Sequence, residues 1–201
     1  MNILLPIFYL PPISWFSVFL NPDFEIILEQ FEHFPKQTYR NRADIYGANG
    51  KLSLTIPIKH NGERYMKNIS VSDAENWRKQ HWKSIKTAYQ SSPFFEYYED
   101  RLLNIFENEE PSLMQFNLNA LKTVLNILKT EKNYSFSSEY SDFQQDLDFR
   151  NQFSAKNPPA YNLEKYRQTF SDRFGFIENL SILDLVCNKG PESLTYLKSI
   201  K

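Results

Sequence analysis

The sequence contains very little cysteine, glycine and histidine. Its 201 residues include one Cys, five Gly and three His. A single cysteine excludes an internal disulfide framework and suits a reducing cytoplasm, so we expect a cytoplasmic protein in which Cys187 is a small buried core residue rather than a nucleophile. The histidines at positions 33, 60 and 81 offer no pair at helical spacing, so we expect neither a metal nor a cofactor.

Several motifs of common enzymes are also missing. The chain has no GxxxxGK[ST], GxSxG or HExxH, so phosphate-loop, serine-hydrolase and metalloprotease chemistry have no support. The apolar N-terminus has no basic beginning, and Pro6, Pro11 and Pro12 interrupt it. We therefore expect a buried first strand there rather than a signal peptide or a membrane span.

The composition indicates one globular domain, residues 1–201, because no Pro/Gly/Ser-rich linker divides the chain. The net charge is −1, yet residues 33–86 contain eleven Lys and Arg against four Asp and Glu, a local excess of +7. This excess favours an anionic small molecule at the first half of the chain, such as a nucleotide sugar. The overall pI near 6.3 and the absence of a recognised motif argue against nucleic acid.

Apolar runs near the N-terminus predict a strand, a helix and a second strand. The strands are Asn2–Leu10 and Phe24–Glu29, with a helix over Ile13–Leu20 between them. Such a crossover makes the strands parallel, and ligands bind at the carboxyl ends of parallel strands. Tyr9 and Pro11 follow the first strand, so we predict that they form one wall of a substrate pocket.

Two carboxylates mark the end of the second predicted strand. Glu29 or Glu32 is a candidate general base if it faces Arg40 or Arg42. Surface charge is the simpler interpretation of both residues.

Asn49-Gly50 predicts a type I′ turn that pairs 42–48 with 51–58 as a central hairpin in a mixed sheet. Arg40, Asn41 and Arg42 enter this hairpin. Guanidinium groups held beside a rigid sheet bind carboxylate or phosphate through paired hydrogen bonds, so we predict that these three residues bind the anion. A solvated basic loop is the alternative.

A capping box over Ser72–Glu75 predicts the start of a helix that runs to Tyr89. Trp77 and His81 lie on its apolar face. We predict that His81 transfers protons in catalysis, and a hydrogen-bonded core histidine is the alternative.

Helices predominate in the second half of the chain. The pattern predicts helices over 94–107 and 111–129, a short strand over 134–136, and helical segments over 180–187 and 192–199. The predicted fold is therefore α/β, with an N-terminal βαβ unit, a central hairpin with helices packed on it, and a helical C-terminal half.

Five segments together resemble the WbqC-like family of bacterial proteins. They are YLPPISWF, KQTYRNR, GANGKLSLTIPIKH, NWRKQHWKSIKTAYQSSPFFEYYED and NLSILDLVCNKGPES, and they extend over essentially the whole chain. Many relatives begin QPxYLPW, whereas this chain has Pro6–Tyr9 as PIFY, without Gln or His ahead of the tyrosine.

The resemblance implies an enzyme of cell-surface polysaccharide assembly. Family members occur in O-antigen gene clusters and have been proposed to help form amides on amino sugars. The resemblance thus implies a transferase that moves an acyl or aminoacyl group to the amine of an activated amino sugar. It also makes Asp184 and Asn188, in the C-terminal motif, candidate substrate ligands. A non-catalytic module that binds an anionic glycan precursor or a protein partner is the alternative.

Overall fold

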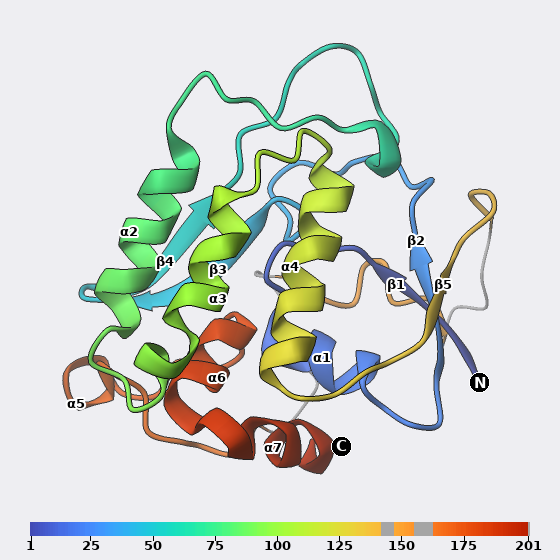
Figure 1. The fold of residues 1–201 in the computed structure, drawn as a ribbon. Helices are drawn as coiled ribbons and strands as arrows, with labels where there is room; N and C mark the ends of the chain where they lie inside the picture. Colours follow the sequence, from blue (N-terminus) through green and yellow to red (C-terminus); the bar gives the residue numbers. More distant parts are fainter. Residues whose placement is uncertain (142–146, 155–162, 201) are drawn as a thin grey trace.

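The computed structural model describes residues 1–141, 147–154 and 163–200 and confirms the mixed α/β fold (Figure 1). The N-terminal unit consists of β1 (Asn2–Pro6), α1 (Ile13–Phe19) and β2 (Glu25–Glu29), and its two strands are parallel, as predicted. A third parallel strand, β5 (Tyr134–Phe136), pairs with β2 on the other side, so the sheet order is β1-β2-β5.

The hairpin forms a second, separate sheet of β3 (Arg42–Gly47) and β4 (Gly50–Thr55). Its predicted turn is wrong, because Gly47 pairs with Gly50 and the loop residues are Ala48 and Asn49. A type I′ turn needs a positive φ at both loop positions, which a residue with a Cβ resists. The chain instead places a positive φ, +97°, at Gly50, just after the loop.

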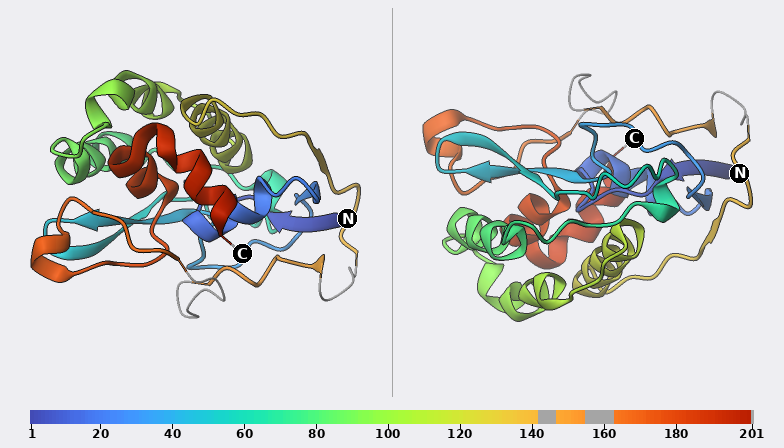
Figure 2. Two further views of the ribbon diagram at one scale, coloured as in Figure 1. Left: turned by 90° about the horizontal axis from the view of Figure 1, so that it is seen from below. Right: turned by 90° about the horizontal axis from the view of Figure 1, so that it is seen from above.

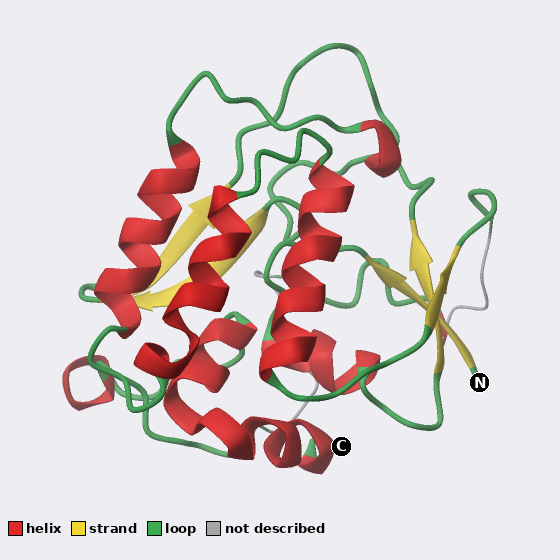
Figure 3. Ribbon diagram, viewed as in Figure 1, coloured by secondary structure: helices red, strands yellow, loops and turns green. Residues whose placement is uncertain are grey.

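Three helices follow the hairpin, α2 (Trp77–Tyr89), α3 (Phe95–Glu107) and α4 (Leu113–Ile127), and α2 packs against β3 while α3 lies between α2 and α4. Figure 3 shows α2 and α3 in front of the two strands with α4 to one side, and Figure 2 shows the short helix α5 (Ser171–Phe174) on the opposite side of the hairpin. The capping box predicted at Ser72 is wrong. Its hydroxyl accepts a hydrogen bond from the Ala74 amide, two residues on, which closes a local turn, and α2 begins only at Trp77.

The C-terminal segment joins the hairpin to the N-terminal unit. It contains α6 (Ile182–Lys189), a 3₁₀ turn η3 (Gly190–Glu192) and α7 (Ser193–Ser199), and a further 3₁₀ turn, η1 (Met66–Asn68), lies after the hairpin. The Ser181 amide donates to the Asp44 carbonyl of β3, and the Ile182 amide donates to the Pro11 carbonyl. Helix α6 therefore lies in the core, and Cys187 is fully buried as predicted.

Candidate functional site

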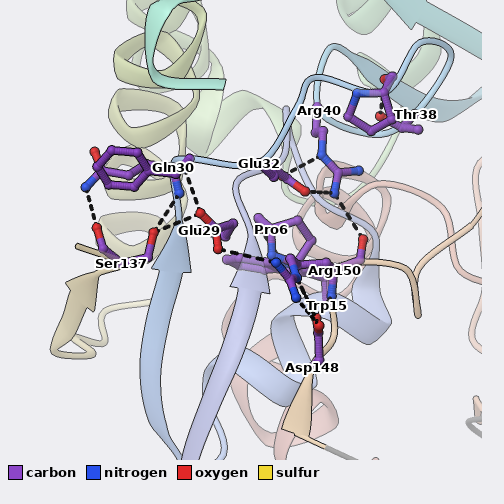
Figure 4. A network of polar contacts seen from close by, with 12 residues as sticks. Pro6, Trp15, Glu29, Gln30, Glu32, Thr38, Arg40, Ser137, Asp148 and Arg150 are labelled. Atoms are coloured by element: carbon purple, nitrogen blue, oxygen red, sulfur yellow. Dashed lines mark hydrogen bonds and ion pairs between the residues drawn. The ribbon is translucent and has the colours of Figure 1, made fainter. Parts of the chain in front are cut away.

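A cluster of buried charges occupies the carboxyl edge of the parallel sheet, where β1 and β2 end (Figure 4). Glu29, the last residue of β2, is fully buried, and Glu32 is 5% exposed. Their interpretation as surface charge is therefore wrong. Two buried arginines, Arg40 and Arg150, face these carboxylates. Ligands of parallel sheets bind at this edge.

Arg40 and Glu32 form a two-point ion pair, so Glu32 meets the condition set for a candidate base that it face an arginine. Arg40 Nε lies 2.6 Å from Glu32 Oε1, and Nη2 lies 2.5 Å from Oε2. Nη2 also donates to the Arg150 carbonyl at 3.0 Å. Burial raises the pKa of Glu32, and the Arg40 hydrogen bonds oppose that rise. Arg40 thus serves chiefly to hold Glu32.

Arg150 contacts two carboxylates, but one of its nitrogens forms no hydrogen bond with a described residue. Its Nε and Nη2 bind Asp148 at 2.5–2.9 Å. Its Nη1 lies 3.7 Å from Glu29 Oε2, too far for a hydrogen bond. Within the described residues, neither of these two buried atoms has a hydrogen-bond partner. Glu29 Oε2 and Arg150 Nη1 therefore form a long ion pair at this edge, and neither atom is hydrogen-bonded to a described residue.

The second oxygen of Glu29 is fixed in place. Oε1 accepts from the Phe31 amide at 2.6 Å and from the Ser137 hydroxyl at 2.9 Å. Ser137 follows β5, so the two neighbouring strands of the sheet together orient this carboxylate. A base must be held in position in this way before it can act on a bound substrate.

Two cavities meet at Arg150. The larger, about 320 Å³, is lined by Glu32, His33, Pro35, Tyr65, Tyr140, Arg150 and Asn151. The smaller, about 210 Å³, shares Pro35, Arg150 and Asn151 with it and is also lined by Gln37, Thr38, Tyr39, Arg40, Phe153 and Ser154. Of the candidate residues named from the sequence, Glu32 and Arg40 belong to these described linings.

The other predicted anion ligands lie at the base of the hairpin. Asn41 is buried, and its side-chain amide donates to the Ile56 carbonyl at 2.9 Å, which ties the two ends of the hairpin together. Arg42 is half-buried, and its Nε has no hydrogen-bond partner among the described residues. Their role in anion binding stays a prediction.

Tyr9 and His81 meet in the core beside α2. The Tyr9 hydroxyl lies 3.0 Å from His81 Nδ1, and the two rings stack. Burial lowers the pKa of His81 to about 4, although a hydrogen bond with the Thr55 backbone opposes the shift. The imidazole is therefore neutral at pH 7. Its catalytic role stays a prediction, as does the pocket-wall role of Tyr9 and of Pro11, whose carbonyl accepts from the Ile182 amide.

Asp184 lies in a separate polar cluster under α6. Its Oδ2 accepts from the Tyr166 hydroxyl at 2.6 Å and from the Gln168 side-chain amide at 2.8 Å. Asn188, one turn later, donates to the Asp184 carbonyl at 2.7 Å. These bonds attach the segment before α5 to α6. The substrate-binding role of Asp184 and Asn188 stays a prediction.

We expect Asp184 to make stability depend on pH. Burial raises its pKa to about 6, so the folded protein binds this proton more tightly than the unfolded chain does. The contribution is stabilising at pH 4 and is lost as pH rises through 6. The difference in unfolding free energy between wild type and Asp184→Asn should therefore fall by about 2 kcal/mol from pH 4 to pH 7 in urea titrations. Asp172→Asn, at an exposed position, is the control, and a difference independent of pH would contradict the prediction.

Sequence reasoning missed Arg150 and its partner Asp148. One signal could have found them, because Arg150 is the sole Lys or Arg between positions 133 and 155, within an acidic stretch. An isolated cation among acidic residues, two positions from an aspartate, indicates an internal ion pair. The pattern does not show that the pair reaches the end of β2.

The described residues contain neither a group of metal-ligating side chains nor a helix suited to crossing a membrane. No three His, Cys, Asp or Glu side chains come together as a metal site. Each helix in the described parts of the chain is too short or too polar to span a bilayer.

The fold and site define a mixed α/β protein with a buried ionic cluster at the carboxyl end of its parallel strands. The model of the WbqC-like protein family matches residues 8–157, which contain that whole cluster. The chain therefore belongs to the WbqC-like family. It is 23% identical over 218 residues to the uncharacterized protein Rv1507c of Mycobacterium tuberculosis, covering 94% of each chain. No solved structure matches it.

Proposed function

We propose that the protein is a transferase of cell-surface polysaccharide biosynthesis, of the O-antigen type. It would move an acyl or aminoacyl group to the amine of an activated amino sugar at the carboxyl edge of the parallel sheet. Membership of the WbqC-like family supports this role. The observation that carries it is the long ion pair of Glu29 Oε2 with Arg150 Nη1, two buried atoms that form no hydrogen bond within the described residues.

The charge of the cluster suits an amine. Among the described residues, Glu29, Glu32 and Asp148 form ion pairs with Arg40 and Arg150, so three carboxylates surround two guanidinium groups. The net negative charge favours a ligand that arrives as an ammonium ion. Such a ligand could pair with Oε2 of Glu29.

The same two atoms could supply both functions that amide formation needs. Glu29 Oε2 would take a proton from the ammonium group, and the freed nitrogen would attack the carbonyl carbon of the acyl donor. As the C–N bond forms, the carbonyl oxygen becomes negative and would accept a hydrogen bond from Arg150 Nη1. The bond to the leaving group then breaks, and the leaving group departs with its electron pair and takes up the second proton, which the attacking nitrogen loses as the amide forms.

Two of the predicted site residues would act by positioning. Arg40 would hold Glu32, and His81, neutral at pH 7, would hold the Tyr9 hydroxyl.

Glu29→Gln tests the proposal, because glutamine keeps the shape and one acceptor oxygen but cannot take the proton. We expect amide formation to fall by about 100-fold or more. The assay combines a panel of nucleotide-activated amino sugars with acyl and aminoacyl thioesters and detects the amide by mass spectrometry. Glu25→Gln, at the exposed start of the same strand, is the matched control and should keep full activity.

An active Glu29→Gln variant would remove Glu29 from the mechanism. Wild-type protein that binds an amino sugar nucleotide in thermal-shift assays but forms no amide with any donor would favour the alternative, a non-catalytic binding module.

A further inference from the structure

A third cavity, about 390 Å³, lies between the chain after β2 and the chain after β4. The Phe34 amide donates to the Arg64 carbonyl at 2.7 Å, and His33 pairs with Tyr65 as an isolated bridge, so the two segments are tied together. The cavity is lined by His33, Phe34, Lys36, Ile58, Lys59, His60, Gly62, Glu63, Arg64 and Ile69. We call it the basic pocket.

The charge of the basic pocket is almost entirely positive. Lys36, Lys59 and Arg64 line it together with His33 and His60. Its single acidic residue, Glu63, accepts a hydrogen bond from the Asn68 side chain at 3.0 Å. Three fixed cations around one hollow repel one another, and a bound anion would remove that cost.

The cations of the basic pocket also lack ion-pair partners among the described residues, whereas some lysines elsewhere have them. Lys86 and Lys189 form ion pairs with Glu99 and Glu192. Within the described residues, Lys36, Lys59 and Arg64 form no ion pair and no side-chain hydrogen bond. Their donors are therefore available to a ligand. Lysine and arginine donors around a concave surface suit the closely spaced oxygens of a diphosphate.

The basic pocket borders the charged cluster. His33 lines both this pocket and the 320 Å³ cavity that contains Glu32 and Arg150. A ligand with a diphosphate at one end and an amine at the other could therefore place the diphosphate among the cations of the basic pocket and the amine beside the carboxylates of the charged cluster.

We propose that the basic pocket is a diphosphate-binding site that holds the activating group of the substrate. The link to the substrate amine rests on the proposed function, whereas diphosphate binding by itself does not. Lys59 and Arg64 would bind the phosphate oxygens directly.

Titration calorimetry with inorganic pyrophosphate and with UDP tests the proposal. The variant Lys59→Ala/Arg64→Ala should bind both ligands about 100-fold more weakly, since each lost charge-assisted hydrogen bond costs about tenfold. The matched control, Lys83→Ala/Lys122→Ala, removes two exposed cations outside the described lining and should change the dissociation constants less than about twofold. All four substituted residues are exposed, so both variants should keep the wild-type Tm.

Equal weakening in the two double variants, or no pyrophosphate binding by the wild type, would overturn the proposal. The two hypotheses fail separately. If the wild type and Glu29→Gln both bind pyrophosphate while the wild type forms no amide with any donor, the diphosphate site stands and the transferase proposal falls. If Lys59→Ala/Arg64→Ala keeps both pyrophosphate binding and turnover, only the diphosphate site falls.

Discussion

Replacing Gly190 with alanine should lower the free energy of unfolding by about 3–5 kcal/mol, because two costs add. Gly190 has φ +52°, in the left-handed region where a Cβ is strained. A Cβ built there would also lie 2.4 Å from the Phe94 ring, closer than atoms can approach without displacement. Urea unfolding followed by far-UV circular dichroism measures the loss.

Gly62→Ala is the matched control for the strain alone. Gly62 has φ +86°, but nothing lies within 4 Å of its Cβ position, so we expect a loss of about 1 kcal/mol. Removing the ring should relieve the clash, and Gly190→Ala should therefore cost less in a Phe94→Ala background. Equal losses for the two glycine variants would show that the contact with Phe94 is not tight.

The Gly190 contact explains how two of the recognised sequence segments belong together. Phe94 lies in SPFFEYYED and Gly190 in NLSILDLVCNKGPES, and the Phe94 amide donates to the Cys187 carbonyl at 3.0 Å. The start of α3 and the end of α6 are thus in direct backbone contact. A glycine and an aromatic residue almost a hundred positions apart form one packing unit.

Most of the elements followed from local patterning. The two parallel strands and α1, the hairpin strands, α3, α4 and β5 all lie where apolar periodicity and breakers indicated. The wrong prediction of where α2 begins has a tertiary cause, which is a contact with a distant segment of the chain. Ser72 matched a capping box, but the Val71 amide donates to the Pro111 carbonyl and holds the chain extended there, so α2 begins later.

The site was predictable only in part, because local patterns locate the ends of strands but not the contacts between segments that are distant in the sequence. Parallel strands direct attention to their carboxyl ends, which made Glu29 and Glu32 candidates there, whereas Arg40 was singled out in the basic run that enters the hairpin. This reasoning could not place Arg150 at the same edge, because Arg150 is 110 residues away from Arg40 in the sequence and its carbonyl accepts a hydrogen bond from Arg40 there. His81 and Asp184 were assigned from the sequence to the same catalytic function, but each is buried in its own part of the core with its own tyrosine partner.

Arg40→Ala should lower the free energy of unfolding by about 3–5 kcal/mol, because it leaves Glu32 buried without its counter-ion. Lys86→Ala is the matched control. It breaks a surface ion pair, Lys86 to Glu99 at 2.6 Å, and should cost less than about 1 kcal/mol. Urea unfolding at pH 7 compares the two variants.

The loss of unfolding free energy in Arg40→Ala should also depend on pH, and the charge of the Glu32 carboxylate sets the direction of that dependence. Burial already raises the pKa of Glu32, and removing Arg40 takes away the hydrogen bonds that oppose this rise. A carboxyl whose pKa is higher in the folded protein stabilises the fold below its unfolded pKa, and that contribution is lost as pH rises through the folded pKa. The deficit of Arg40→Ala should thus shrink as pH falls toward 4. Substituting both partners, as Glu32→Ala/Arg40→Ala, should cost less than the two single losses added together. A deficit that stays constant with pH, or additive losses, would contradict the prediction that buried Glu32 needs Arg40 as its counter-ion.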